Sequence, residues 1–351
     1  MEKNNKKQHK HKLGQYFTTN YQYILQNFYI PDEIKTIIEP FVGNGDLLNF
    51  ISDKTKYTIE CYDIEPRNSY TVQRDTILFP PSYFNKFVLS NPPYIARNKS
   101  DEKTLFNKYD VNDLYKCFIK EILINRVLGG IIIIPLNFWC SIRKKDAELR
   151  KDFLKVYSVI QLNIFEEQVF QDTTTTVCSF QFKLKTEINI NHNIAITIFP
   201  LQKKMAISLN AENNYTIGGH LYQLETSGRY RITRLTTKNQ YKKSTNILAK
   251  CIDDNRNNKI GLSIVNDENI YIDDTPNNSS RTYATLIIEP EIDLSKQNTL
   301  VERWNEFIET NRSEYHSLFL TNFRESSDIG RKRISFELVY RIAEYILDQL
   351  E

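Results

Sequence analysis

Short apolar runs, separated by polar and helical stretches, fill the first half of the chain. The runs at 87–90 and 131–134 are continuous rather than alternating, which is typical of strands covered on both faces. Residues 57–62 and 173–182 predict further strands. Between these runs, apolar positions recur at helical spacing. Strands that alternate with helices over residues 34–185 predict an α/β domain with a doubly wound, mostly parallel sheet.

The pattern changes near residue 186, where the chain becomes β-rich and asparagine-rich and the alternation of strands and helices stops. An amphipathic helix is predicted near the end, at about 335–350. We therefore expect a catalytic domain at 13–185 and a smaller mixed α+β domain at 186–351. The lysine-rich residues 1–12 are expected to form a flexible basic arm.

Composition narrows the class of protein. The net charge of +3 is small, so an anionic partner must be bound by a local basic patch. The five cysteines are scattered, without CxxC pairs or Cys/His clusters at metal spacing, and we expect no metal. The longest apolar stretch is too short to span a membrane. We expect a soluble, cytoplasmic protein without membrane contact.

The residues Asn91, Pro92, Pro93 and Tyr94 directly follow the predicted strand at 87–90. Two prolines cannot donate ladder hydrogen bonds and fix the backbone in one conformation. The Asn91 side chain and a proline carbonyl then form a rigid pair of hydrogen-bond acceptors beside the Tyr94 ring. This arrangement suits a flat substrate with an exocyclic amino group, which donates two hydrogen bonds while its ring stacks. Turn chemistry alone also explains Asn and Pro here.

Acidic residues and glycines follow the neighbouring predicted strands. Glu39 ends one strand, and Gly43 and Gly45 let the backbone approach a ligand closely. An acid in place of a third glycine disfavours a pyrophosphate and favours a cationic amino group. Asp63 follows the next strand, where nucleotide-binding α/β proteins place an acid on the ribose hydroxyls. Asp75 lies in a loop that suits an adenine amino group.

The second half of the chain contains a basic segment, residues 228–250, with seven arginines and lysines and no acid. Arg229 and Arg231 are expected on the same face of a strand. Together with Arg234 and Lys243 they are candidates for contacts with an anionic partner. A solvated lysine-rich surface explains the same composition.

Five stretches of the chain, taken together and in this order, resemble motifs of the amino-methyltransferases that act on DNA, specifically the N6-adenine group with gamma-type motif order. The resemblance covers residues 12 to about 185, and implies a Rossmann-like, S-adenosylmethionine-dependent methyltransferase fold followed by a target-recognition domain. No single motif would suffice, but the order makes the set specific. The stretches are Gly14–Thr19, Glu39–Leu48, Asp63–Pro66, Asp75 and Asn91–Tyr94.

The resemblance implies a role for each matched cofactor residue. Thr18 would contact the methionyl carboxylate of S-adenosylmethionine, although as a residue before a helix it also suits an N-cap. Glu39 would bind the amino group of the cofactor, and Gly43 and Gly45 would let the backbone approach it. Asp63 would bind the ribose hydroxyls, Ile64 would lie on the adenine face, and Asp75 would accept a hydrogen bond from the adenine amine.

The resemblance also implies how the target base is held. Asn91 and the Pro92 carbonyl would accept the amino hydrogens of a flipped-out adenine that stacks on Tyr94. Phe170 stands where the family places a second aromatic contact for this base. Val42 differs from the commoner Cys or Ala of the family without removing a functional group.

We therefore predict a site-specific DNA adenine-N6 methyltransferase that converts S-adenosylmethionine to S-adenosylhomocysteine, needs no metal and acts on double-stranded DNA as the modification enzyme of a restriction–modification system. A separate cognate restriction endonuclease is its expected partner; a lone methyltransferase, and a monomer or a dimer, fit equally. RNA adenine, protein glutamine and cytosine N4 stay open as methyl acceptors. A non-catalytic DNA-binding subunit on the same scaffold is the alternative from another class.

Overall fold

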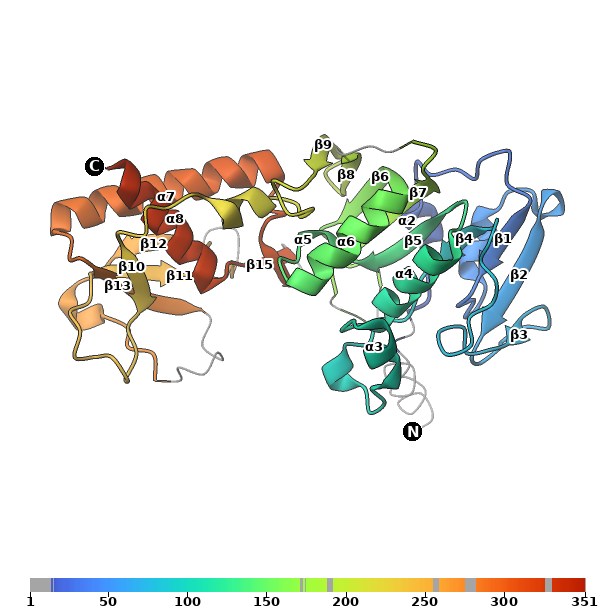
Figure 1. Cartoon of the computed structure of the whole chain (residues 1–351), viewed down its shortest axis with the longest axis horizontal. Helices are drawn as coiled ribbons and strands as arrows, with labels where there is room; N and C mark the ends of the chain where they lie inside the picture. The colour runs from blue at the N-terminus through green and yellow to red at the C-terminus, as the bar shows by residue number, and fades with distance from the viewer. Residues whose placement is uncertain are drawn as a thin grey trace. The chain divides into compact units, whose positions relative to one another are not determined.

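The computed structural model of the chain describes residues 14, 16–170, 173, 175–187, 192–254, 259–274, 282–325 and 330–350. The predicted basic arm at 1–12 lies outside the described residues. The described residues divide into two compact units between Asn210 and Ala211 (Figure 1).

The first unit is built on one sheet of nine strands. These are β1 (Thr36–Glu39), β2 (Thr58–Asp63), β3 (Val72–Gln73), β4 (Phe87–Ser90), β5 (Gly129–Pro135), β6 (Tyr157–Phe165), β7 (Val177–Leu184), β8 (His192–Phe199) and β9 (Lys203–Leu209). Their order is β3-β2-β1-β4-β5-β7-β6-β8-β9. The first five are parallel, β7 is antiparallel to both β5 and β6, and β8 is parallel to β6 and antiparallel to β9. The predicted mostly parallel, doubly wound sheet is confirmed.

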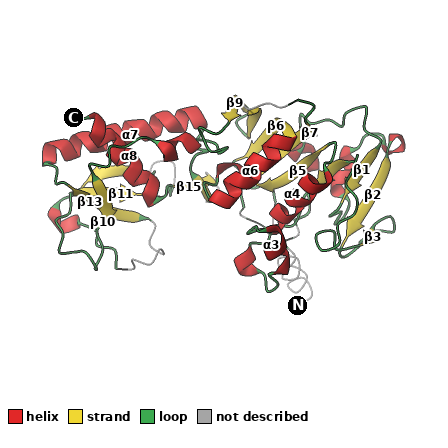
Figure 2. Ribbon diagram, in the orientation of Figure 1, coloured by secondary structure: helices red, strands yellow, loops and turns green. Residues whose placement is uncertain are grey.

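Helices connect these strands, and α4 and α6 lie side by side over the sheet (Figure 2). One of the helices predicted between the strands from apolar positions at helical spacing is α4. The stretch that ends at Leu48 forms the 3-10 helix η1, and left-handed Gly43 and Gly45 occupy the loop before it. The elements are α2 (Tyr21–Ile24), η1 (Asp46–Phe50), η2 (Lys54–Lys56), η3 (Arg97–Lys99), α3 (Thr104–Tyr109), α4 (Leu114–Asn125), α5 (Asn137–Cys140) and α6 (Lys144–Val156).

The order of the strands places a ligand site at one edge of the sheet. From β1 the chain continues outward through β2 and β3, whereas β4 and β5 lie on the other side of β1. The carboxyl ends of β1 and β4 therefore flank a topological switch point, where open α/β sheets bind their ligands. The central strands are covered on both faces, as predicted: Ile131–Ile134 in β5 are all 0% exposed.

The domain boundary predicted at 185/186 lies inside the first unit. β8 pairs in parallel with β6, from Gln161 opposite Ala195 to Phe165 opposite Phe199, and β9 extends the sheet further. The alternating buried side chain pattern of β8 was hidden in asparagine-rich sequence. The division between the units falls after β9 and not after β7, because β8 and β9 complete the sheet.

The second unit is a mixed α+β structure, as predicted. Its four-stranded sheet has the order β10-β13-β11-β12, and β14 and β15 form a separate antiparallel pair. No helix that the structure describes, in either unit, is long and apolar enough to cross a membrane. The elements are η4 (Gly219–Gln223), β10 (Arg231–Arg234), β11 (Ile247–Lys250), β12 (Gly261–Ile264), η5 (Asp267–Asn269), β13 (Tyr283–Glu289), α7 (Leu294–Tyr315), β14 (Thr321–Glu325), β15 (Gly330–Arg333) and α8 (Phe336–Gln349).

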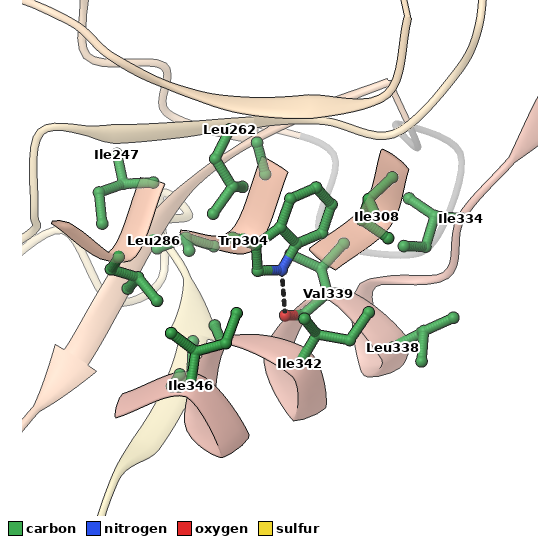
Figure 3. Packing of buried hydrophobic residues seen from close by; sticks show 14 of the residues in the cluster. Ile247, Leu262, Leu286, Trp304, Ile308, Ile334, Leu338, Val339, Ile342 and Ile346 are labelled. Carbon is green, nitrogen blue, oxygen red and sulfur yellow. Dashed lines mark hydrogen bonds between the residues drawn. The ribbon is translucent and has the colours of Figure 1, made fainter. Parts of the chain in front are cut away.

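The core of the second unit surrounds Trp304 of α7, which is fully buried. Its indole Nε1–H donates to the Val339 carbonyl of α8 at 3.3 Å (Figure 3). Ile342 and Ile346, on the predicted apolar face of α8, are buried in the same cluster. Ser335 begins this helix and accepts a hydrogen bond from the N–H of residue 338. The two helices are therefore joined by both apolar packing and one directed hydrogen bond.

We expect Trp304→Phe to destabilise the second unit by about 1–3 kcal/mol, because it removes the Nε1–H donor and part of the buried ring volume. Urea unfolding followed by far-UV circular dichroism measures the loss. Trp139, the other tryptophan of the chain, lies in the first unit, so its fluorescence reports that unit alone. If the Trp139 transition shifted by the same amount, the expectation that the substitution destabilises only the second unit would be wrong.

Candidate active site

A cavity opens at the carboxyl ends of β1, β2 and β4, where the polar side chains predicted from the sequence converge. Five of the predicted residues are not part of its lining and are buried: Glu39, Gly45, Pro92, Tyr94 and Phe170. The lining includes Tyr16, Phe17, Thr18, Val42, Gly43, Asp63, Ile64, Asp75, Asn91 and Pro93.

The loop after β1 depends on two glycines in the left-handed region, Gly43 at φ +55° and Gly45 at φ +86°. A Cβ atom on Gly43 would lie 2.8 Å from the Phe17 ring, and one on Gly45 would lie 2.4 Å from the Tyr70 hydroxyl. Side chains at either position would be strained and would clash. The loop therefore presents bare backbone at the cavity at Gly43, whereas Gly45 lies outside the cavity lining.

Asp63, at the end of β2, ties this loop in place. The carboxylate is 3% exposed; its Oδ2 accepts from the Gly43 N–H at 2.7 Å, and its Oδ1 accepts from the Glu65 N–H at 2.8 Å. Each carboxylate oxygen has a further lone pair, and the side chain lines the cavity. Sequence reasoning gave Asp63 a ligand role only; the structure adds that Asp63 joins two loops of the site.

Asp75 and Ile64 line the same cavity. Asp75 Oδ1 accepts from the N–H groups of Ile77 and Leu78, at 3.1 and 2.9 Å, which fixes the turn that carries it. Ile64 is 42% exposed and offers an apolar surface. The site thus places a carboxylate and an apolar face together, a combination that suits a flat heterocycle with an amino group.

Glu39 is buried beneath the site, with 1% of its surface exposed. Its Oε1 accepts from the Phe41 N–H at 3.4 Å, whereas its Oε2 has no hydrogen-bond partner among the described residues. Burial, reinforced by the charge of Asp63, raises the pKa of Glu39 well above its usual 4.5. A buried acceptor without a partner is costly, so Glu39 suits a donor that a ligand brings, above all a cationic one.

The amide of Asn91 is held in one orientation by the segment that precedes α2. Its Nδ2 donates to the Tyr16 carbonyl at 2.8 Å and to Thr18 Oγ at 3.1 Å. Because a carbonyl can only accept, the Tyr16 carbonyl requires the NH₂ end of the amide, and Oδ1 must face the other way. Oδ1 accepts from the Tyr94 hydroxyl. Thr18, predicted to contact the cofactor or to cap a helix, contacts Asn91.

Tyr94 differs from expectation, because its ring is not open to a substrate. Only 9% of the residue is exposed. The Tyr16 ring stacks on it with centroids 5.4 Å apart, and Tyr115 meets it edge-on at 6.1 Å. Its backbone N–H donates to the Gly14 carbonyl at 3.1 Å, so the segment before α2 is fixed across it. Its hydroxyl also lies 2.9 Å from the Ile133 carbonyl.

Sequence reasoning assigned no role to Tyr16, although it lies within the first of the quoted motifs. The ring of Phe170, which is 4% exposed, lies 6.2 Å from the Tyr16 ring. Tyr16 therefore contacts both aromatic residues predicted to stack on a target base. The available signal was its place two residues before Thr18, on a segment already assigned to the site.

The basic candidates of the second unit are not arranged as expected. Strand β10 begins at Arg231, so Arg229 precedes the strand instead of sharing one of its faces. Arg229 and Arg231 are both exposed, and the Arg229 guanidinium lies 5.6 Å from the centre of the Tyr230 ring. The strand starts late because Gly228 is left-handed and residues 228–230 are not paired.

The other two candidates are paired with acids from distant parts of the chain. Arg234 lies 3.1 Å from Asp273, and Lys243 lies 2.6 Å from Glu291. The segment is free of acids in sequence, but β13 and the neighbouring loops bring acids to it in space. Arg229 and Arg231 thus remain as the exposed arginine candidates for contact with a phosphate.

No protein-family model matches the chain, and no curated protein matches its sequence. Three solved structures illustrate its structural similarities. A structure described as the modification subunit of a candidate type I restriction enzyme from Vibrio vulnificus YJ016 is 12% identical, with a TM-score of 0.42, over 54% of this chain and 49% of that one. The methyltransferase subunit of a type I restriction–modification system from Streptococcus thermophilus is 13% identical, with a TM-score of 0.39, over 56% and 49%.

The third structure, the M protein of the type I restriction enzyme EcoKI, is 11% identical, with a TM-score of 0.39, over 96% of this chain and 72% of that one. The chain spans about half the length of the first two structures. At these identities and TM-scores the similarity does not assign an activity to this chain.

Proposed function

We propose that the chain is an S-adenosylmethionine-dependent methyltransferase that modifies the N6 amino group of adenine in duplex DNA. The observation that carries the proposal is the fixed amide of Asn91, which lines a cavity also lined by Gly43 and Asp63. An acceptor for a substrate amine and a loop shaped for a nucleoside cofactor thus share one cavity.

The residues at the ends of β1 and β2 fit the cofactor. The unpartnered Glu39 Oε2 suits its amino group, and the bare backbone at Gly43 allows close approach. Asp63 would bind the ribose hydroxyls with its remaining lone pairs, and Asp75 would accept from the adenine amine. Bound there, S-adenosylmethionine would supply a methyl group on a positively charged sulfur and leave as S-adenosylhomocysteine.

The chain's own residues would prepare the amine for attack. The lone pair of adenine N6 is delocalised into the ring, so the nitrogen is a poor nucleophile. With the base bound, the Asn91 Oδ1 and the carbonyl of Pro92, which lies outside the cavity lining of the free protein, would accept its two hydrogens and favour a tetrahedral nitrogen with a free lone pair. Burial raises the pKa of the Tyr94 hydroxyl well above its usual value, so Tyr94 remains a donor and holds Asn91 Oδ1 in place. Much of the rate gain would come from this positioning.

Duplex DNA is the proposed substrate because the chain carries a second unit with an exposed arginine, Arg231, on its sheet. The target adenine would leave the duplex to reach the cavity. A role as the modification enzyme of a restriction–modification system, beside a separate endonuclease, follows as part of the same proposal.

The test is incubation of the purified protein with unmethylated duplex DNA and methyl-labelled S-adenosylmethionine, followed by nucleoside analysis of the digested DNA. We expect label in N6-methyladenine at a subset of adenines. Label in N4-methylcytosine would keep the mechanism and correct the base. No label in DNA, with label in structured RNA or in protein offered in parallel incubations, would overturn the proposed substrate.

The raised pKa of Glu39 predicts that cofactor binding depends on pH. Only the ionised carboxylate pairs with an ammonium group, and the free protein holds Glu39 neutral at pH values where an ordinary carboxyl is ionised. Affinity for S-adenosylhomocysteine should therefore continue to rise with pH above the range in which an ordinary carboxyl group titrates, and should fall as the pH decreases. Isothermal titration calorimetry across this range measures the slope and the uptake or release of protons.

The test variant is Glu39→Gln. Its control is Glu33→Gln, at an exposed position. Glu39→Gln should bind at least about tenfold more weakly at pH 7.5, the loss of one charged hydrogen bond, and without the slope. Glu33→Gln should behave as the wild type. An unchanged slope in Glu39→Gln would show that another group titrates.

Thr18→Val should reduce kcat about fivefold to tenfold, because Asn91 Nδ2 loses one of its two acceptors. Thr18→Ser keeps the oxygen and should restore kcat. Steady-state methylation of DNA at varied cofactor concentration separates kcat from KM. A rise of the cofactor KM alone, with kcat unchanged in Thr18→Val, would contradict the orienting role and favour the predicted contact with the cofactor carboxylate.

A further inference from the structure

Tyr16 occupies the place where a flipped base would have to stack. We propose, on the basis of the function proposed above, that the Tyr16 side chain holds the place of the target base in the free protein and leaves it when the base enters.

The ring contacts carry this inference. Tyr16 lies 5.4 Å from Tyr94 with 30° between the ring planes, and 6.2 Å from Phe170 with 33° between them. The first pair is stacked and the second is tilted, and both separations fall within the range of favourable contacts between aromatic rings. A base that stacked on Tyr94 or contacted Phe170 would adopt a similar geometry, so Tyr16 and the base would compete for the same space.

No surface of Tyr94 is free for a base while Tyr16 stays in place. The residue is 9% exposed; its hydroxyl is engaged near Asn91 Oδ1 and the Ile133 carbonyl, and Tyr115 meets its ring from α4. Tyr115 is itself 3% exposed and packed in the core. Tyr16 is the partly exposed neighbour and lines the cavity, so it is the ring that can turn toward solvent.

The backbone of Tyr16 is anchored independently of its ring. Its carbonyl accepts from Asn91 Nδ2, and the nearby Gly14 carbonyl accepts from the Tyr94 N–H. Rotation about the Cα–Cβ bond therefore moves the ring without breaking the contacts that orient Asn91. The same residue fixes the catalytic amide through its carbonyl and fills the stacking place through its side chain.

A filled stacking place has a chemical consequence. A candidate ligand must replace the stacking that Tyr16 provides before it gains any of its own, so small non-aromatic molecules cannot displace the ring. A purine can, because it restores an aromatic contact with Tyr94. Tyr16 is thereby a residue that selects for flat aromatic substrates.

The test uses 2-aminopurine riboside, a fluorescent adenine nucleoside analogue whose emission falls on stacking, titrated into the full chain saturated with S-adenosylhomocysteine. Tyr16→Ala should bind the analogue about twofold to tenfold more tightly than the wild type, the factor of one aromatic stacking contact. Tyr16→Phe, which keeps the ring, should match the wild type. Equal or weaker binding by Tyr16→Ala would overturn the proposal; weaker binding would make Tyr16 itself the stacking platform.

Two further measurements keep the result interpretable. Calorimetry with S-adenosylhomocysteine checks that each variant is folded. If Tyr16→Ala does not bind S-adenosylhomocysteine, Tyr16→Leu is used in its place. The nucleoside-binding assay does not depend on whether the protein methylates DNA. A gain in Tyr16→Ala without any DNA methylation by the wild type would sink the proposed substrate alone, whereas methylation without a gain would sink the place-holding role alone.

Discussion

Replacing Asn91 by alanine is expected to reduce methyl transfer by on the order of 100-fold to 1,000-fold, the typical loss when a preorganised hydrogen-bonding group is removed from a reacting centre. The amide is held by the Tyr16 carbonyl and Thr18, and its Oδ1 would accept from the substrate amine. Alanine removes that acceptor and leaves the amine hydrogens with the Pro92 carbonyl alone. Single-turnover methylation with labelled cofactor measures the chemical step directly.

The control for this variant is Asn98→Ala, at an exposed position of η3, which should methylate as the wild type does. Affinity for S-adenosylhomocysteine should stay within about threefold of the wild type in Asn91→Ala, because the proposed cofactor contacts lie after β1 and β2, and a threefold change is no more than the loss of a weak contact. Undiminished turnover in Asn91→Ala would refute the proposed mechanism.

Asp63→Ala should weaken cofactor binding by at least about 100-fold, since it removes a carboxylate that accepts two backbone hydrogen bonds and lines the cavity proposed for the cofactor. The Gly43 and Glu65 N–H groups would lose their acceptors, at 2.7 and 2.8 Å in the wild type. The loop after β1 would then be free to leave the geometry that lets backbone approach the cofactor. Calorimetric titration with S-adenosylhomocysteine measures the loss.

Asp63→Asn separates the two roles of this side chain. It keeps one acceptor oxygen, so part of the loop contact survives, and its binding should lie between those of Asp63→Ala and the wild type. Asp32→Ala, at an exposed position, is the matched control. Cofactor binding by Asp63→Ala that equals the control would show that neither the loop nor the ribose depends on this carboxylate.

Local sequence signals predicted the central features of the first unit. The apolar run of β4 and the two prolines after it are contiguous, and a proline stops a strand wherever the rest of the chain lies. The continuous β-branched run of β5 likewise requires cover on both faces. For the same reason the positions of Asn91 and Asp63 at strand ends were predictable, because the end of a strand is encoded within a few residues.

Features that depend on distant segments were not predictable. Tyr16 covers Tyr94 although the two lie 78 positions apart in the sequence, and no pattern near either residue specifies that contact. The burial of Glu39 and its unpartnered oxygen arise from the same convergence of loops. The place of β8 and β9 in the sheet was not predicted, because the polar, asparagine-rich sequence around the start of β8 masks the alternation of buried and exposed positions in that strand.

The pairing of the basic segment at 228–250 with acids changes what its charge is able to do. Lys242 lies 2.9 Å from Glu289, and Lys243 lies 2.6 Å from Glu291. A polyanion that engages these lysines displaces carboxylates fixed to the chain, and not only mobile counterions. Binding would therefore release fewer salt ions than the number of basic residues implies. Acidic side chains of the protein itself thus act as counterions to these lysines, and they weaken non-specific binding to a phosphate backbone.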